Sequence, residues 1–262
     1  MSAADHRGHA PRALLVPALI ALVFLVLPLA ALVARVNWST FVTDVTSDAA
    51  RDALVLSLVT GLVATAVCAI VGVPLALTIA RSGPRVAAVL RAAVTIPLVL
   101  PPMVGGVALL YLFGRAGWFG GLGLSFSTPA VVLAQTFVAL PFLVLAVEGA
   151  VRTSGVEYER TAAALGANRW TILRRVTLPL AAPGIVAGVV LCFARAIGEF
   201  GATALFAGNR PGVTQTMPLA IYTAFNGAGV SQGTAVALAL LLLAAAIAVL
   251  LLVRGWRPGA TR

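Results

Sequence analysis

Long apolar runs separated by short polar segments make up most of this chain. A helix needs about 20 apolar residues to cross the hydrocarbon core of a membrane, and six runs reach about that length. Because unpaired backbone groups are costly in lipid, each run is expected to form an α-helix rather than part of an open sheet. The pattern therefore predicts an all-α, polytopic membrane protein with six transmembrane helices. These predicted helices cover residues 13–34, 53–80, 88–113, 129–151, 181–206 and 232–253.

The composition agrees with that fold class, since 61% of the 262 residues are hydrophobic and only 10% are charged. A soluble domain has about a quarter of its residues charged. The formal net charge of +10 comes from arginines alone, most of which flank the apolar runs. Arginine in short loops marks the cytoplasmic side, so this charge indicates membrane orientation rather than a nucleic-acid partner.

The arginine distribution predicts that both chain ends lie in the cytoplasm. Arginines cluster in the tail 1–12, between the second and third predicted helices, in the segment 152–180 and in the tail 255–262. The other side carries fewer arginines, partly offset by aspartates. We therefore predict an N-in, C-in topology with a membrane domain at 13–254 and a cytoplasmic loop at about 152–180.

Candidate catalytic and metal-binding groups are scarce. The chain has no lysine, so it cannot supply the lysine of a Walker A phosphate-binding loop. His6 and His9 lie in the N-terminal tail with only Asp5 as a further ligand type, so no metal site is predicted. Cys68 and Cys192 fall in apolar runs and are expected to be small core residues. No catalytic residue and no directly bound cofactor are predicted.

Prolines and glycines are densest in the stretch TIPLVLPPMVGG, residues 95–106. Proline removes a backbone hydrogen bond from a helix, and the freed groups must be satisfied by protein or water. The adjacent Pro101 and Pro102 therefore indicate either a broken helix that lines a translocation path or a kink that serves helix packing. The sequence leaves these two interpretations open.

Arg195 and Glu199 lie inside an apolar run, where charge is costly and commonly functional. Their i, i+4 spacing places them on one helical face, so they are expected to pair. A structural ion pair is one interpretation, but we favour a gate or a polar lining of a substrate path, because a mid-span pair is an unusual source of packing stability. Glu148, near the cytoplasmic end of the fourth predicted helix, is expected to be interfacial.

The loop at 207–231 surrounds a short apolar segment at 217–225 with glycine, asparagine and proline, which favour turns. An apolar segment of this length is too short to span a bilayer. It is predicted to be re-entrant or interfacial, at the external mouth of a pathway.

The segment ERTAAALGANRWTILRRVTLPLAAPGI begins at Glu159 and predicts two short helices joined by a hinge. Tyr158, Ala162 and Leu165 share one helical face, at i, i+4 and i+7. Gly166 is placed to end that helix in a left-handed conformation, and Asn168 to cap a second helix. The resulting elbow suits either a partner protein or the lipid headgroups of the membrane surface. The second helix has its own apolar face, formed by Trp170, Leu173 and Val176.

The spacing in this segment resembles the Glu-Ala-Ala loop of ABC importer permeases. That loop reads Glu-Ala-Ala, three residues, Gly, nine residues, Ile, any residue, Leu-Pro. Here nine residues separate Gly166 from Val176, residues 177–179 read Thr-Leu-Pro, and Ala162 falls at the second alanine. The segment departs from the pattern at Arg160, which stands at the glutamate position, at Thr161, and at Val176 in place of isoleucine. Glu159 stands one residue early.

The resemblance implies a type I permease of the bacterial plasma membrane, working as a homodimer with an extracytoplasmic binding protein. It also implies that the elbow is a coupling loop seated on a separate ATPase subunit, which uses ATP and Mg²⁺. The residues assigned to this loop are Glu159, Arg160, Ala162, Ala163, Leu165, Gly166, Val176, Leu178 and Pro179.

Residues 194–225 most resemble the molybdate branch of this family, chiefly through the run at 214–222. The resemblance implies import of molybdate, or of the chemically similar tungstate. Sulfate permeases share a Gly-Glu-Phe/Tyr-Gly core like that at 198–201, so a sulfate or thiosulfate permease remains an alternative. An ion-coupled secondary transporter or channel, and an intramembrane enzyme, are further alternatives. The residues predicted to line a path or gate are Pro101, Pro102, Arg195, Gly198, Glu199, Gly201 and Thr203.

Overall fold

The computed structural model describes residues 14–154 and 156–255, and these residues form helices and connecting loops without a β-strand. The predicted all-α fold class is confirmed. Almost all of the predicted cytoplasmic tails 1–12 and 255–262, with His6 and His9, lies outside the described residues. The helices are α1 (Leu15–Ala34), α2 (Phe41–Thr46), α3 (Asp48–Arg81), α4 (Pro84–Val99), α5 (Pro102–Phe113), η2 (Gly120–Leu122), α6 (Thr128–Thr153), α7 (Val156–Ala164), α8 (Arg169–Ile172), η3 (Leu173–Thr177), α9 (Leu178–Ile197), α10 (Gly201–Phe206), α11 (Met217–Phe225) and α12 (Gln232–Gly255).

Within the described residues, four helical runs are long and apolar enough to cross a membrane, and α4 with α5 makes a fifth if this bent pair is one span. These four are α1, α3, α6 and the run 169–197, which ends with α9. In α12 the apolar helix described is shorter, at Gln232–Ala248. The predicted count of six spans and the N-in, C-in orientation therefore stay predictions.

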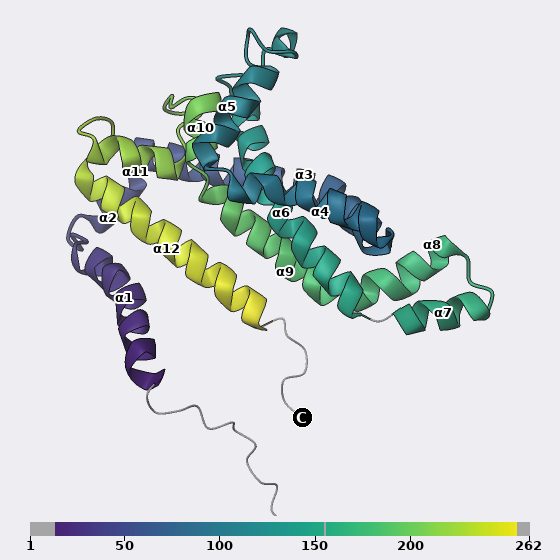
Figure 1. Ribbon diagram of the computed structural model, residues 1–262. Helices are drawn as coiled ribbons and strands as arrows, with labels where there is room; N and C mark the ends of the chain where they lie inside the picture. The colour runs from purple at the N-terminus through teal and green to yellow at the C-terminus, as the bar shows by residue number, and fades with distance from the viewer. Residues whose placement is uncertain (1–13, 155, 256–262) are drawn as a thin grey trace, which may run out of the picture.

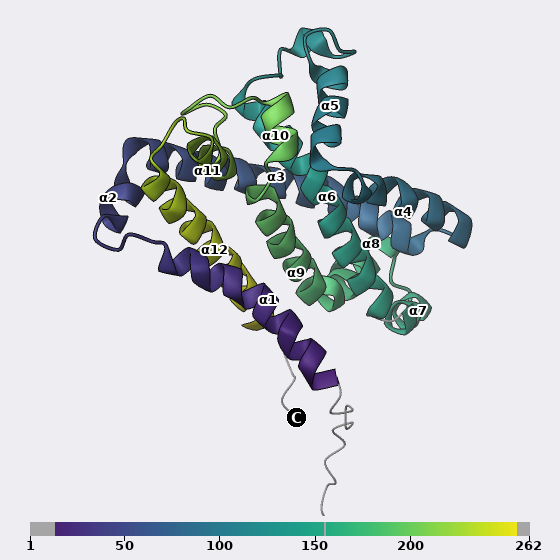
Figure 2. The ribbon, with the colours of Figure 1, turned by 60° about the vertical axis from the view of Figure 1, so that its left-hand side comes forward.

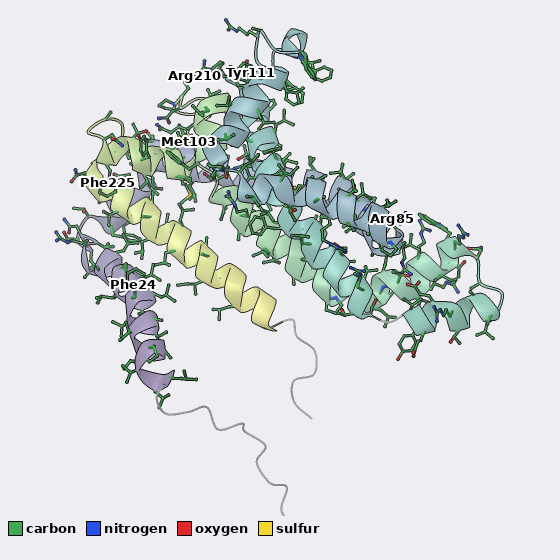
Figure 3. All side chains as sticks on the ribbon, viewed as in Figure 1. Phe24, Arg85, Met103, Tyr111, Arg210 and Phe225 are labelled. Atoms are coloured by element: carbon green, nitrogen blue, oxygen red, sulfur yellow. The ribbon has the colours of Figure 1, made fainter. Side chains whose placement is uncertain are left out.

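Helices α3, α6 and α9 form the centre of the bundle, and the other helices lie around them (Figure 1). Small buried residues such as Ala64, Ala139 and Ala196 let these helices approach closely, as is usual inside membranes. Cys68 and Cys192 are free thiols in the same core, which confirms their predicted role. Helix α1 has no buried residue and lies at the edge of the bundle (Figure 2). Its apolar side chains, including Phe24, project outward (Figure 3).

The predicted helix 88–113 is broken into α4 and α5, and the chain bends by 110° between them. Leu100 and Pro101 between them are extended, with ψ of 136° and 134°. A residue that precedes proline is pushed out of the helical region, and two consecutive prolines apply this restriction twice. The prediction of one continuous helix was wrong, and the alternative of a broken helix is confirmed as geometry.

The predicted helix 181–206 is also wrong as a single element. Helix α9 ends at Ile197, and the short α10 begins at Gly201 and packs against α5. A Cβ on Gly106 would lie 2.9 Å from the backbone of Ala202, and a Cβ on Gly201 would lie 3.0 Å from Pro102 Cβ. Glycine at both positions therefore allows the α5 and α10 backbones to approach closely.

Candidate functional site

Helices α7 and α8 form the predicted elbow around Gly166. The residue has a φ of +84°, its N–H donates to Ala163 O at 3.0 Å, and the N–H of Ala167 donates to Ala162 O at 3.0 Å. This bond pair is the Schellman arrangement, which ends a helix at a left-handed glycine. Asn168 Oδ1 accepts a hydrogen bond from Thr171 N at 2.8 Å and caps the second helix. The predicted hinge and cap are both confirmed.

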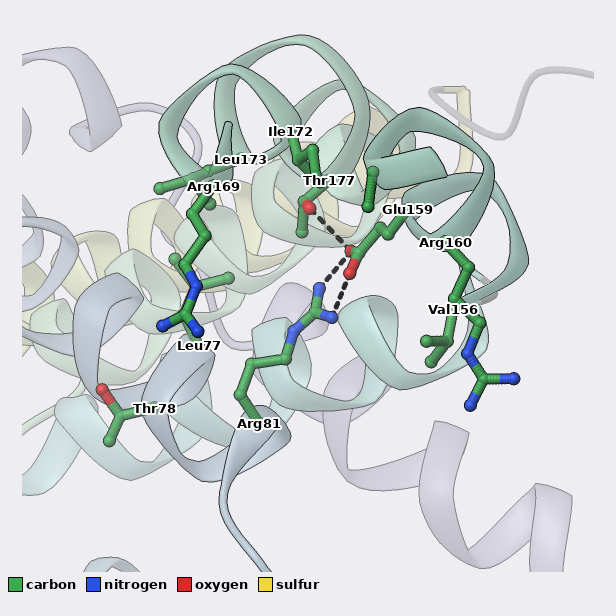
Figure 4. A pocket seen from close by; sticks show the side chains of 11 residues that line it. Leu77, Thr78, Arg81, Val156, Glu159, Arg160, Arg169, Ile172, Leu173 and Thr177 are labelled. Atoms are coloured by element: carbon green, nitrogen blue, oxygen red, sulfur yellow. Dashed lines mark hydrogen bonds and ion pairs between the residues drawn. The ribbon is translucent and has the colours of Figure 1, made fainter. Parts of the chain in front are cut away.

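Glu159 anchors the elbow to the membrane helices. Its carboxylate accepts two hydrogen bonds from the guanidinium of Arg81, the last residue of α3, and one at 2.6 Å from Thr177 Oγ1, directly before α9 (Figure 4). The paired guanidinium, helped by the Thr177 hydroxyl, lowers the pKa of Glu159 below its ordinary value of 4.5 despite partial burial. One side chain therefore joins α7, α3 and the start of α9.

The sequence indicated Glu159 as an elbow residue but not Arg81 as its partner, which lies 78 residues away. The only sequence signal was that both residues fall in segments predicted to be cytoplasmic. Arg160, at the usual glutamate position, is exposed, so the inward-facing acid is the one that stands a residue early.

The outer surface of the elbow is apolar and unusually exposed. The side chains of Leu165 and Trp170 are 84% and 60% exposed, and Tyr158 is also exposed. The Arg174 guanidinium lies 4.6 Å from the centre of the Trp170 ring, a cation–π distance. Exposed apolar groups on a short, well-capped elbow are typical of a surface that a partner covers. Of the remaining predicted loop residues, Ala163 and Pro179 are exposed, and Ala162, Val176 and Leu178 are partly buried.

Arg195 and Glu199 pair as predicted, with 2.7 Å between Arg195 Nη2 and Glu199 Oε2. Their setting differs from the prediction, because Glu199 lies beyond the end of α9 rather than within a helix. Its second oxygen, Oε1, accepts a hydrogen bond from Ala202 N at 2.8 Å, in the first turn of α10. Glu199 is 1% exposed and the Arg195 side chain is 25% exposed, so the pair presents its cationic partner to the surface.

The other residues predicted to line a path differ in how far they are exposed. Gly201, two residues after Glu199, packs on Pro102. This contact places the start of α10 beside the start of α5. Pro101 and Gly198 are exposed. Thr203 is fully buried, and its hydroxyl has no hydrogen-bond partner among the residues that the structure describes. In this conformation Thr203 lies inside the bundle and not on an open surface.

Glu148, predicted to be interfacial, has a buried side chain, and its depth in the membrane stays a prediction. Arg91 Nε on α4 donates to Glu148 Oε2 at 3.2 Å. Arg152, one turn further along α6, donates to Glu148 Oε1 at 3.3 Å. Helix α4, which precedes the proline break, packs on α6, and this packing brings Arg91 to the carboxylate. The i, i+4 arginine was the signal in the sequence, whereas Arg91 was accessible only from the fold.

The short apolar segment predicted at 217–225 is helix α11. The N–H of Met217 donates to Ser57 Oγ of α3 at 2.7 Å, and Leu219 and Ala220 are buried. The polar residues immediately before it, Thr214 and Thr216, are buried as well. The segment is therefore docked against α3 and α12 rather than loose in a loop.

Comparison with known proteins gives a consistent result. The model of a family described as "Binding-protein-dependent transport system inner membrane component" matches residues 72–259. The chain is 49% identical over 257 residues to the molybdenum transport system permease protein ModB of Mycobacterium tuberculosis, covering 96% of each chain. It is 42% identical over 226 residues to a probable molybdenum ABC transporter permease protein of Haloferax volcanii, covering 84% of this chain and 81% of the relative.

A solved structure of a bacterial alginate ABC transporter, in complex with an alginate-bound periplasmic protein, includes a chain of similar fold. The TM-score is 0.66, and the alignment covers 93% of this chain and 91% of that one. The sequence identity is 18%, so this likeness concerns the fold alone.

Proposed function

The chain belongs to the binding-protein-dependent transport system inner membrane components, and we propose that it is the permease subunit of an ATP-driven importer of molybdate or tungstate. It is a multi-pass membrane protein and a transport subunit rather than an enzyme. The substrate proposal rests on the relatives named for molybdenum transport, which cover nearly the whole chain.

The observation that carries the proposal is the anchored elbow. Its outer surface exposes Leu165 and Trp170, while Glu159 ties its inner side to Arg81 of α3 and Thr177 before α9. A partner that moved the elbow would therefore move two central membrane helices. We propose that this partner is a separate ATPase subunit, since the chain has no lysine for a Walker A loop. ATP and Mg²⁺ would be bound by that subunit.

We propose further that two copies of the chain assemble around the pathway, with a molybdate-binding protein on the extracytoplasmic side. Closed two-fold symmetry is the commonest oligomeric arrangement. Helices α4 and α5 carry exposed apolar residues such as Val99 and Tyr111, which a second copy or lipid would cover. The partly exposed Arg195 is a cation available to balance an oxyanion in transit.

ATP-dependent uptake by the assembled complex in proteoliposomes tests this function. Labelled molybdate should be taken up only with ATP and the ATPase subunit present, and unlabelled tungstate should compete. Sulfate taken up as well as molybdate would overturn the substrate and leave the permease role. Uptake that runs on an ion gradient without the ATPase would instead favour a secondary transporter.

A further inference from the structure

A surface cavity of about 620 Å³ lies between the elbow and the end of α3. Its volume is within the range of about 300–1,000 Å³ that small-molecule sites have. Figure 4 shows the Arg81–Glu159 pair with Arg169 on one side and Arg160 on the other. We refer to this space, which Arg81, Glu159, Arg160 and Arg169 help to line, as the elbow cavity.

The elbow cavity has an excess of positive charge. Arg81 is neutralised by Glu159, whereas neither Arg160 nor Arg169 forms an ion pair with any residue that the structure describes. Guanidinium groups bind phosphate oxygens through paired, charge-assisted hydrogen bonds. Two arginines beside an already neutral pair therefore favour an anionic ligand with phosphate-like oxygens.

The rest of the lining is largely apolar. Leu77 comes from α3, Ile172 from α8 and Leu173 from η3, and Val156 and Ala163 of α7 add further apolar surface. A free oxyanion would leave most of this surface facing water, because a small tetrahedral ion cannot cover it. A ligand with an anionic head and a hydrocarbon portion matches both the charge and the apolar lining.

The position of the cavity matches a membrane boundary. Arg81 is the last residue of α3, a helix apolar enough to span a bilayer, so the cavity lies where the hydrocarbon core gives way to headgroups. The apolar outer surface of the elbow is separate, since Tyr158, Leu165 and Trp170 are not among the described residues that line the cavity. An ATPase subunit seated on that surface would leave the cavity to another occupant.

We propose that the elbow cavity binds an anionic phospholipid of the cytoplasmic leaflet, with Arg160 and Arg169 on its phosphate and an acyl segment against Leu77, Ile172 and Leu173. This inference uses the cytoplasmic placement of the elbow in the proposed function. It gives Arg160, which stands at the position of the family's glutamate, a lipid headgroup as its partner.

Native mass spectrometry of the permease and its ATPase subunit, purified in detergent, tests the site with added phosphatidylglycerol and phosphatidylcholine. In the double variant Arg160→Gln, Arg169→Gln, retention of phosphatidylglycerol should fall at least fivefold, with phosphatidylcholine unchanged. The matched control is Arg174→Gln, Arg175→Gln, which removes the same charge from exposed positions outside the cavity lining and should stay within twofold of the wild type.

Three results would overturn the proposal: equal loss of phosphatidylglycerol in both double variants, no loss in either, or displacement by millimolar inorganic phosphate. Loss of the ATPase subunit from the cavity variant with lipid retention intact would assign the cavity to the protein partner instead. If the double variant does not fold, Arg160→Gln alone is the test. It should fold, because Arg160 is exposed, and it should reduce retention of phosphatidylglycerol at least twofold. Because the readout is lipid retention, failure of the transport assay would leave this test unaffected.

Discussion

Two acidic residues hold this molecule together in different ways, Glu159 in the elbow and Glu199 between α9 and α10. Glu159 is still in reach of water, with a side chain 14% exposed, and joins segments 78 and 18 residues away. Glu199 is almost fully enclosed and, among the residues that the structure describes, its side chain binds only near neighbours, Arg195 four residues before it and Ala202 three residues after it. The first residue connects segments that are distant in the sequence, and the second fixes one local bend.

The difference in surroundings decides how much each ion pair contributes to the stability of the fold. A pair near water gains modest free energy, because solvent screens the charges. A buried pair has already lost hydration, so removing one partner leaves an uncompensated charge that is expensive to keep. We therefore expect substitutions around Glu199 to affect folding, and substitutions around Glu159 to affect coupling to the ATPase.

The largest effect is expected from Arg195→Ala. It would leave the Glu199 carboxylate buried with only its bond from Ala202 N, at a cost of about 3–5 kcal/mol. Thermal unfolding of the purified permease measures this loss. The double variant Arg195→Met, Glu199→Gln should unfold at a higher temperature than Arg195→Ala, and the reverse order would contradict the buried-charge explanation.

The α5–α10 contact beside Glu199 should be nearly as sensitive. In Gly106→Ala the new methyl group would lie 2.9 Å from the Ala202 backbone, and we expect overpacking to cost about 1–3 kcal/mol. Gly149→Ala is the matched control, since this helical glycine in α6 has no atom within 4 Å of an added Cβ. Equal unfolding temperatures for the two variants would show that the contact is not tight.

The elbow should respond to backbone conformation rather than to packing. Gly166→Ala forces alanine into a φ of +84°, which should cost about 1–2 kcal/mol locally although the space around it is open. Co-purification of the ATPase subunit should fall while the unfolding temperature of the membrane core hardly changes. Gly83→Ala, with a φ of −61° and equally open space, should co-purify as the wild type does.

Removing the charge of Glu159 should weaken coupling with little loss of stability. Glu159→Gln loses the ion pair with Arg81, for which we expect about 1 kcal/mol. ATPase activity that is stimulated by the binding protein should decrease, while the yield of folded permease is retained. Glu157→Gln on the exposed side of α7 is the control, and an equal decrease in that variant would point to general surface charge.

The smallest effect is a pH dependence of the same ion pair. The pKa of Glu159 is lowered below 4.5, so its contribution to stability is present above pH 4.5 and is lost as the pH falls through the lowered pKa. The difference in unfolding temperature between wild type and Glu159→Gln should be constant from pH 7 to pH 5 and shrink below 4.5. A difference that persisted unchanged to pH 3 would contradict this assignment.

Local features of this kind were accessible from the sequence. The left-handed turn at Gly166, the cap at Asn168 and the pairing of Arg195 with Glu199 each depend on residues within a few positions of one another. The positions of most long helices were also predictable, because apolar length and helical periodicity are properties of single segments. The two predicted helices that failed, 88–113 and 181–206, are those in which proline or glycine interrupts an apolar run.

What the sequence by itself determined is an all-helical membrane protein with a hinged, apolar elbow, since burial in lipid and backbone conformation act on each segment separately. The tertiary structure decided which distant groups meet. Arg81 reaches Glu159 across 78 residues and Arg91 reaches Glu148 across 57, and no periodicity in the chain encodes either pair. Such contacts follow from the angle of the proline break and from the close approach of α3, α6 and α9, which are set only when the helices pack together.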